Sequence, residues 1–308
     1  MIKIRGFVKR YDQFVAVDHL DLDIEQGDVF GFIGPNGAGK TTTIRFLTTL
    51  LKPTSGQAEI NGFSVTKQVD DVKRSIGFMP DTFGLYDGMK VWEFLDFFAT
   101  AYGLPRSKRR ALIDDVLELV DLTSKREALV NGLSRGMQQR LCLAKTLVHD
   151  PPVLILDEPA SGLDPRARVE MKALLKELQK MGKTILVSSH ILPELADFCN
   201  KIGIIERGKL LAAGPVQDVI RSIRQNRVVE VVVATQSEAC EVTLAHHPHV
   251  RNLTVAENRF KFEFMGNDDD VLALHKDLLM QDIPVVWFNE VQADLEEAFM
   301  KITKGLVA

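Results

Sequence analysis

The feature that most constrains this chain is an eight-residue segment, GPNGAGKT, at positions 34–41. It follows a short apolar run, VFGFI, at 29–33 and precedes a segment with a helical pattern. Glycine has no Cβ, so backbone N–H groups in such a segment can curl around an anion. The pattern G-x-x-x-x-G-K-[ST] between a strand and a helix is typical of a phosphate-binding loop. The segment therefore predicts an α/β domain that binds a nucleotide.

Each part of this loop has a predicted role. Lys40 supplies a positive charge for the β and γ phosphates, and the Thr41 hydroxyl can ligate Mg²⁺. The helix that starts there directs the positive end of its dipole at the anion. The predicted nucleotide-binding residues of the loop are Gly34, Pro35, Asn36, Gly37, Ala38, Gly39, Lys40, Thr41 and Thr42.

Two acidic residues, Asp157 and Glu158, end a second apolar run, VLILDE (153–158). A continuous apolar run is typical of a strand buried on both faces. At the end of such a strand Asp157 can hold Mg²⁺ through water, and Glu158 can orient or deprotonate an attacking water. The alternative is a solvated acidic pair at a strand end. The phosphate loop in the same chain favours the catalytic interpretation.

The remaining apolar runs predict the rest of a first domain over residues 1–220. TILVSS (184–189) and KIGIIE (201–206) have the pattern of further buried strands. Their alternation with helical patterns predicts an α/β body with a largely parallel sheet. Residues from about 89 to 149 are helical in pattern almost throughout. We therefore expect a helical subdomain inserted into the α/β body.

Residues 221–308 differ in pattern and predict a small C-terminal accessory domain. They read as strand, helix, strand, strand, helix, strand and a final helix, LEEAFMKIT (295–303). RFKFEF alternates, which places Phe260, Phe262 and Phe264 on one face of a strand. The order of elements predicts an α+β, ferredoxin-like arrangement.

Charge and cysteine usage limit the function classes. The chain has a net charge of −4; residues 227–308 carry 14 acidic and 7 basic side chains, a net of −7, which leaves +3 for residues 1–226. This distribution argues against a nucleic-acid partner. The three cysteines lack paired spacing, so we expect a reduced, cytoplasmic setting. No run approaches the roughly 20 apolar residues of a membrane helix, so any work at a membrane needs another chain.

These residues together resemble the ATP-binding subunit of an ABC transporter, over roughly residues 1–220. GPNGAGKT and VLILDE resemble the two Walker motifs of that family, and LSRGMQQR (133–140) resembles its signature. SGLD (161–164) resembles the loop that crosses the dimer interface. His190 resembles the switch histidine at the γ-phosphate, and Tyr11 the aromatic residue that stacks on adenine. A core histidine and a packed strand aromatic are the respective alternatives.

The resemblance implies a P-loop ATPase in which two subunits face each other head to tail around two ATP. Ser134 and Gly136 are then expected to present a second anion-binding helix start to the ATP of the other subunit. A purely structural helix cap at Ser134 is the alternative. Glu158 and His190 are the implied catalytic residues. Thr41, Asp157 and Asp81 are the implied Mg²⁺ site.

The implied partners are an integral membrane permease and a second ATP-binding subunit, at the inner face of the cell membrane. Phe83, Tyr86 and Trp92 are predicted to line the groove for the permease, and the ending LEEAFMKIT resembles subunits that serve separately encoded exporters. Three other functions stay open. They are a soluble ABC-type ATPase acting on DNA or ribosomes, a phosphate-loop kinase or GTPase outside this family, and a non-transporting regulator gated by the C-terminal domain.

Three positions depart from the family pattern. Arg135 and Met137 stand where the signature usually has glycine and glutamine, and Asp81 replaces a glutamine that touches Mg²⁺ and senses the membrane partner. Aspartate is one methylene shorter, so both ligation through water and altered coupling are open. Arg135 is predicted to face either the phosphates or the solvent and a partner.

Overall fold

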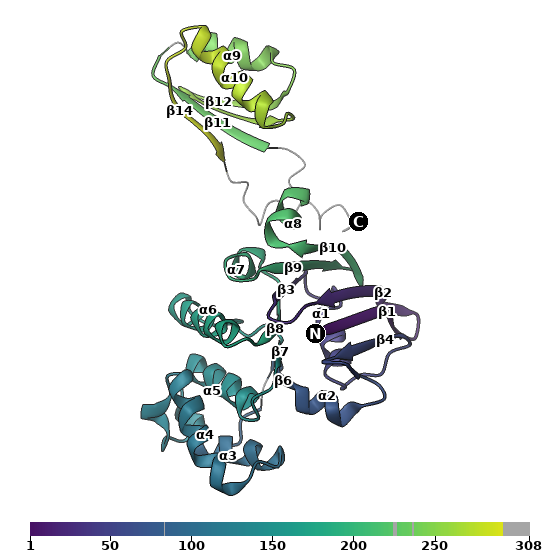
Figure 1. Cartoon of the computed structure of the whole chain (residues 1–308). Helices are drawn as coiled ribbons and strands as arrows, with labels where there is room; N and C mark the ends of the chain where they lie inside the picture. The colour runs from purple at the N-terminus through teal and green to yellow at the C-terminus, as the bar shows by residue number, and fades with distance from the viewer. Residues whose placement is uncertain (83, 224–226, 236, 292–308) are drawn as a thin grey trace. The chain divides into compact units, whose positions relative to one another are not determined.

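The computed structural model describes residues 1–82, 84–223, 227–235 and 237–291 (Figure 1). The chain divides into two compact units, Met1–Val219 and Ile220–Ala308. The division lies next to the boundary predicted from the sequence. Among the described residues, no helix combines the length and the apolar character that a membrane span requires.

A six-stranded sheet forms the centre of the first unit, in the order β10-β9-β3-β8-β7-β6. All neighbouring strands are parallel except β9 and β10, which confirms the predicted, largely parallel sheet. Every residue of β3, β7 and β8 is buried, as expected for strands covered on both faces. The strands are β3 (Val29–Ile33), β6 (Ile76–Met79), β7 (Val153–Leu156), β8 (Thr184–Ser189), β9 (Lys201–Glu206) and β10 (Lys209–Pro215).

Helices and a second sheet cover the two faces of this sheet. Figure 1 shows α6 (Pro165–Lys180) and α7 (Leu192–Ala196) on one side, and α1 (Lys40–Leu47) with the second sheet on the other. Phe7 of the second sheet stacks on Phe46 of α1, with ring centroids 4.1 Å apart. These contacts hold α1, and so the segment before it, in a fixed place.

The second sheet is antiparallel, in the order β2-β1-β4-β5. Its first two strands form a hairpin with a turn of two residues, Asp12 and Gln13, which sets Tyr11 directly opposite Phe14. The elements of this region are β1 (Ile2–Tyr11), β2 (Phe14–Ile24), β4 (Ser55–Ile60), β5 (Phe63–Ser64) and α2 (Val69–Ser75).

Residues 89–149, where the helical subdomain is predicted, are mostly helical. They contain α3 (Val91–Ala101), α4 (Arg106–Leu119) and α5 (Arg135–Leu147), with two 3₁₀ turns, η1 (Thr123–Lys125) and η2 (Val130–Gly132). The apolar side chains of α5 recur at helical spacing and are buried, Leu141, Ala144 and Leu147 among them. The start of α5 thereby has a fixed direction.

The second unit has the element order β-α-β-β-α-β and an antiparallel sheet, β12-β13-β11-β14. Phe260, Phe262 and Phe264 are all buried on one face, as the alternation predicted. The ferredoxin-like assignment stays a prediction, and the final predicted helix at 295–303 lies outside the described residues. The elements are β11 (Arg227–Val233), α9 (Ser237–His246), β12 (Val250–Ala256), β13 (Arg259–Phe264), α10 (Asp268–Met280) and β14 (Val285–Val291); α8 (Val216–Ile223) precedes them.

Candidate active site

The loop between β3 and α1 has a shape that only glycine permits at two positions. A Cβ on Gly34 would lie 2.2 Å from the carbonyl oxygen of Ile205. A Cβ on Gly39 would lie 2.7 Å from the carbonyl oxygen of Ala16, and Gly39 has a φ of 109°. Both distances are far inside van der Waals contact. Backbone, and not side chains, therefore lines this part of the loop, as an anion cradle requires.

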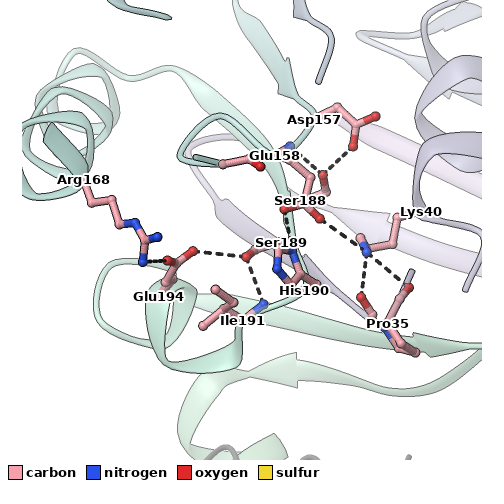
Figure 2. A network of polar contacts seen from close by, with 12 residues as sticks. Pro35, Lys40, Asp157, Glu158, Arg168, Ser188, Ser189, His190, Ile191 and Glu194 are labelled. Carbon is pink, nitrogen blue, oxygen red and sulfur yellow. Dashed lines mark hydrogen bonds and ion pairs between the residues drawn. The ribbon is translucent and has the colours of Figure 1, made fainter. Parts of the chain in front are cut away.

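Lys40 occupies the middle of this cradle and is only 5% exposed. Its Nζ donates to the carbonyl oxygen of Gly34 at 2.6 Å and to that of Pro35 at 3.3 Å. It also lies 3.4 Å from Oε1 of Glu158 (Figure 2). A buried ammonium is costly unless it is paired, and these oxygens supply the pairing. The cation is thus held at the place where the sequence predicts the phosphates.

Glu158 lies between two nitrogen groups. Its Oε1 faces Lys40, and its Oε2 lies 2.9 Å from Nδ1 of His190 (Figure 2). Glu158 also has a φ of 51°, a left-handed conformation that is uncommon for a long side chain. Such backbone strain is concentrated at functional sites. His190 is 44% exposed in its side chain, so the alternative of a core histidine is wrong.

Asp157 lies behind Glu158 and is buried. Ser188 Oγ donates to Asp157 Oδ1 at 2.6 Å and accepts from the backbone N–H of Glu158 at 2.9 Å. Burial raises the pKa of Asp157; hydrogen bonds from Ser188 and Thr41 lower it, and the charges of Glu158 and Asp81 raise it further. A cation beside Asp157 would favour its ionised form.

An open cleft brings the predicted site residues together. Its lining includes Tyr11, Pro35 to Thr42, Asp81, Glu158 and His190. Phe14, which the sequence analysis missed, also lines it. Tyr11 and Phe14 are 46% and 64% exposed. Tyr11 therefore does not pack as an ordinary strand aromatic, and the two rings stand at the mouth of the cleft.

The signature segment lies elsewhere. Ser134 Oγ accepts from the backbone N–H of Met137 at 3.4 Å, which confirms Ser134 as the N-cap of α5. Among the described residues, neither Ser134 nor Gly136 lines the cleft of its own chain.

Arg135 is exposed and also makes a contact that neither predicted orientation includes. Its Nη2 donates to the carbonyl oxygen of Ser161 at 3.4 Å, and its guanidinium lies over Gly162. Gln139 Nε2 donates to the same carbonyl oxygen at 3.1 Å. The start of α5 is thus joined to the SGLD loop of its own chain.

The donor set fits a magnesium nucleotide. Thr41, Asp157 and Asp81 supply the hard oxygen atoms that Mg²⁺ prefers. Within the described residues, no three histidine, cysteine or acidic side chains gather into a metal site made of protein alone. Mg²⁺ usually binds through one or two carboxylates together with substrate phosphates.

Several known proteins have sequences similar to this one. Residues 17–161 match the family described as ABC transporter. The chain is 36% identical over 308 residues to the bacitracin transport ATP-binding protein BcrA of Bacillus licheniformis, covering 99% of this chain and 98% of that protein. It is 29% identical to the linearmycin resistance ATP-binding protein LnrL of Bacillus subtilis, with 98% of each chain covered. A Nod factor export ATP-binding protein of Burkholderia pseudomallei is 40% identical over 223 residues, 72% of this chain and 73% of its own.

Solved structures resemble the first unit. An ATP-binding subunit of an ABC transporter has a TM-score of 0.66 and 28% identity, and the match covers 72% of this chain and 92% of that one. A dimeric bacterial ABC transporter cassette has a TM-score of 0.64 and 26% identity, over 70% of this chain and 99% of its own. A post-hydrolysis dimer of such a cassette with ADP and Pi is similar at a TM-score of 0.64 and 25% identity. The chain belongs to the ABC transporter family, as an ATP-binding subunit that hydrolyses ATP.

Proposed function

We propose that two ATP-binding subunits, this chain and a copy or close relative, close around two ATP and drive a separate membrane permease in export. The observation that carries the proposal is the position of Glu158 in the phosphate-loop cleft, 3.4 Å from Lys40 and 2.9 Å from His190. A carboxylate beside a phosphate cradle is placed to act on a water that attacks the γ-phosphate.

Each side chain then has a defined task. Glu158 orients the water and accepts its proton, because it is the member of the acidic pair that lines the cleft, while Asp157 is buried. His190, next to Glu158 in the cleft, donates to the γ-phosphate. Thr41, Asp157 and Asp81 would hold Mg²⁺, which neutralises charge on the β and γ phosphates when it is bound.

The two aromatic residues that line the cleft, Tyr11 and Phe14, are suited to bind the adenine base of ATP. Tyr11 and Phe14 face each other across the hairpin turn and are both exposed. An adenine ring lies favourably against aromatic faces, and alanine substitutions at such contacts cost about 1–3 kcal/mol. We assign the base to these two residues, while the backbone of the loop holds the phosphates.

The second subunit completes the site. Its Ser134 and Gly136, at the exposed start of α5, supply backbone N–H groups and a positive helix dipole. They approach the side of the triphosphate that the phosphate loop leaves open. Closure therefore needs ATP, and hydrolysis weakens it.

The helical subdomain is our proposed docking face for the permease at the inner face of the cell membrane. Trp92, Asp96 and Phe97 of α3 line a shallow groove. Tyr86 packs edge-on against Phe97, with ring centroids 5.5 Å apart. Phe83, the third predicted groove residue, lies outside the described residues. The direction we propose is export, because relatives of similar length are named for bacitracin transport and linearmycin resistance.

The decisive experiment replaces Glu158 with glutamine in the full-length chain. ATP should still bind, while kcat falls by about 10²–10³ because the group that acts on the water is lost. The variant should accumulate as an ATP-bound dimer, measured by light scattering after gel filtration. Hydrolysis at the parental rate would remove Glu158 from the mechanism.

A further inference from the structure

A line of polar contacts connects the SGLD loop to the segment that carries His190. Arg168 of α6 donates from Nε to the carbonyl oxygen of Leu163, at 3.0 Å. Its Nη1 forms an ion pair with Oε1 of Glu194 in α7, at 2.9 Å (Figure 2). Arg168 thus bonds simultaneously to the loop and to the next helix.

Glu194 continues the line to His190. Ser189 Oγ donates to Glu194 Oε2 at 3.3 Å and accepts from the backbone N–H of Ile191 at 3.0 Å. Ser189 and Ile191 are the two chain neighbours of His190, so these bonds fix the backbone on both of its sides (Figure 2). Glu194 is therefore linked through Ser189 to the backbone that carries the imidazole.

The contacts are partly shielded from water. The Glu194 side chain is half-buried, and Ser189 is buried. Charge-assisted hydrogen bonds in such surroundings are stronger than exposed ones. α7 has only five residues, so it adds little rigidity of its own. The Arg168–Glu194 pair joins it to α6, while Leu192 and Leu195 bury its apolar face.

We propose that Arg168 and Glu194 are positioning residues that couple the SGLD loop to His190. Among the described residues that line the cleft, neither one appears, so they act through His190 and not on the nucleotide. The inference rests on the proposed function, in which the second subunit contacts this loop. When that subunit docks, it fixes the carbonyl group of Leu163. The carbonyl group fixes Arg168, Arg168 fixes Glu194, and Glu194 in turn fixes the turn at His190.

The simplest rival is a bond that only holds α6 to α7. The chain offers a matched control for it. Lys172 of α6 pairs with Asp197, directly after α7, at 3.1 Å. Within the described residues, this second pair has no bond to the loop or to Ser189. If the Arg168–Glu194 pair only held α6 to α7, the loss of either pair should change kcat to the same extent.

The test compares Glu194→Gln with Asp197→Asn in the full-length chain. For Glu194→Gln we expect kcat to fall about tenfold, because a small displacement of a catalytic group is costly. The KM for ATP and the ATP dissociation constant should stay within about twofold of the parent, since the cleft is intact. Asp197→Asn should keep the parental kcat, and both variants should have similar unfolding temperatures.

A double variant tests whether the two residues act as one unit. If they do, Arg168→Met combined with Glu194→Gln lowers kcat no further than either change alone. Three results would overturn the coupling. The first is a double variant whose loss of kcat is the product of the two single losses. The others are a kcat for Glu194→Gln equal to that of Asp197→Asn, and a loss of kcat that follows a loss of stability. A parent chain without any ATPase activity would instead count against the proposed function itself.

Discussion

The N-termini of two helices in the first unit, α1 and α5, have the same electrostatic character but differ in their caps and in their burial. α1 begins after Gly39, which makes no side-chain cap, and its first residue is the buried Lys40. α5 begins after Ser134, whose hydroxyl caps the helix, and its first residue is the exposed Arg135. Both present backbone N–H groups and a positive dipole end. Only the first is enclosed by the rest of its own chain.

In the dimeric site that we propose, the difference shows which half needs no residue of the second subunit. At α1 the carbonyl groups of Gly34 and Pro35, together with Glu158, surround the lysine. At α5, Arg135 and Gln139 both donate to one carbonyl oxygen of the SGLD loop, that of Ser161, and the helix start stays exposed. A chain that binds ATP by itself needs the first start. A chain that hydrolyses ATP only as a dimer needs both.

The largest effect is expected at the enclosed start. Lys40→Ala removes a buried cation that lines the cleft, and we expect the ATP affinity to fall at least about 100-fold. Calorimetric titration of the full-length chain measures it. Lys183→Ala is the control, since Lys183 is also a buried lysine but is bonded to Asp150 and to the Pro151 carbonyl. That variant should lose stability and keep its ATP affinity. Equal losses of affinity in both would contradict the assignment.

A smaller and more selective effect is expected at the exposed start. Ser134→Ala should leave ATP binding to the single chain unchanged and lower kcat roughly 10- to 100-fold. The uncapped helix start would hold its N–H groups less well, and a lost hydrogen bond to a charged phosphate has about that effect. The measurement is the dependence of ATPase rate on protein concentration.

The same change also removes a helix cap, at a cost of about 1 kcal/mol in stability. Asn267→Ala controls for this, because Asn267 caps α10 in the other unit and accepts from the N–H groups of Asp269 and Asp270. It should lose similar stability with no change in kcat. Full ATPase activity in Ser134→Ala would mean that the exposed start has no part in catalysis.

The sequence predicted those parts of the site that follow from local pattern. The phosphate loop, the acidic pair and the serine cap each depend on residues close together in the chain. The structure places residues 35–42 of the loop and Glu158 around one cleft, with Asp157 buried next to Glu158. Phe14 could have been found in the same way. It is the aromatic residue just beyond the two-residue turn that follows Tyr11.

The remaining contacts depend on which strands are neighbours. Ser188 reaches Asp157 because β8 pairs with β7 in parallel, with Val187 opposite Leu156. Periodicity identifies both strands but gives no pairing order. The contact of Arg135 with Ser161 and the left-handed φ of Glu158 are likewise tertiary in origin. Such features need the assembled fold.

The smallest expected effect is a change in the free energy of unfolding. It tests how much the burial of Asp157 destabilises the fold. Burial raises the pKa of Asp157, so the folded chain holds this proton more tightly than the unfolded chain. That contribution to stability is present below the ordinary aspartate pKa and is lost as the pH rises through the raised value. At neutral pH an ionised Asp157 therefore destabilises the fold. Asp157→Asn keeps the Ser188 hydrogen bond and should raise the unfolding free energy by about 0.5–2 kcal/mol.

This gain should shrink as the pH falls toward the ordinary aspartate pKa, because the parent then carries a neutral carboxyl too. Urea unfolding at several pH values measures it, without nucleotide and without magnesium. ATPase activity should fall in the same variant, since an amide is a weaker ligand for Mg²⁺ than a carboxylate. A variant that loses stability at neutral pH would show that the buried charge is already compensated within the chain. In that case the chain would neutralise the charge of Asp157 before any cation binds. The start of α1 would then depend even less on other molecules than the start of α5.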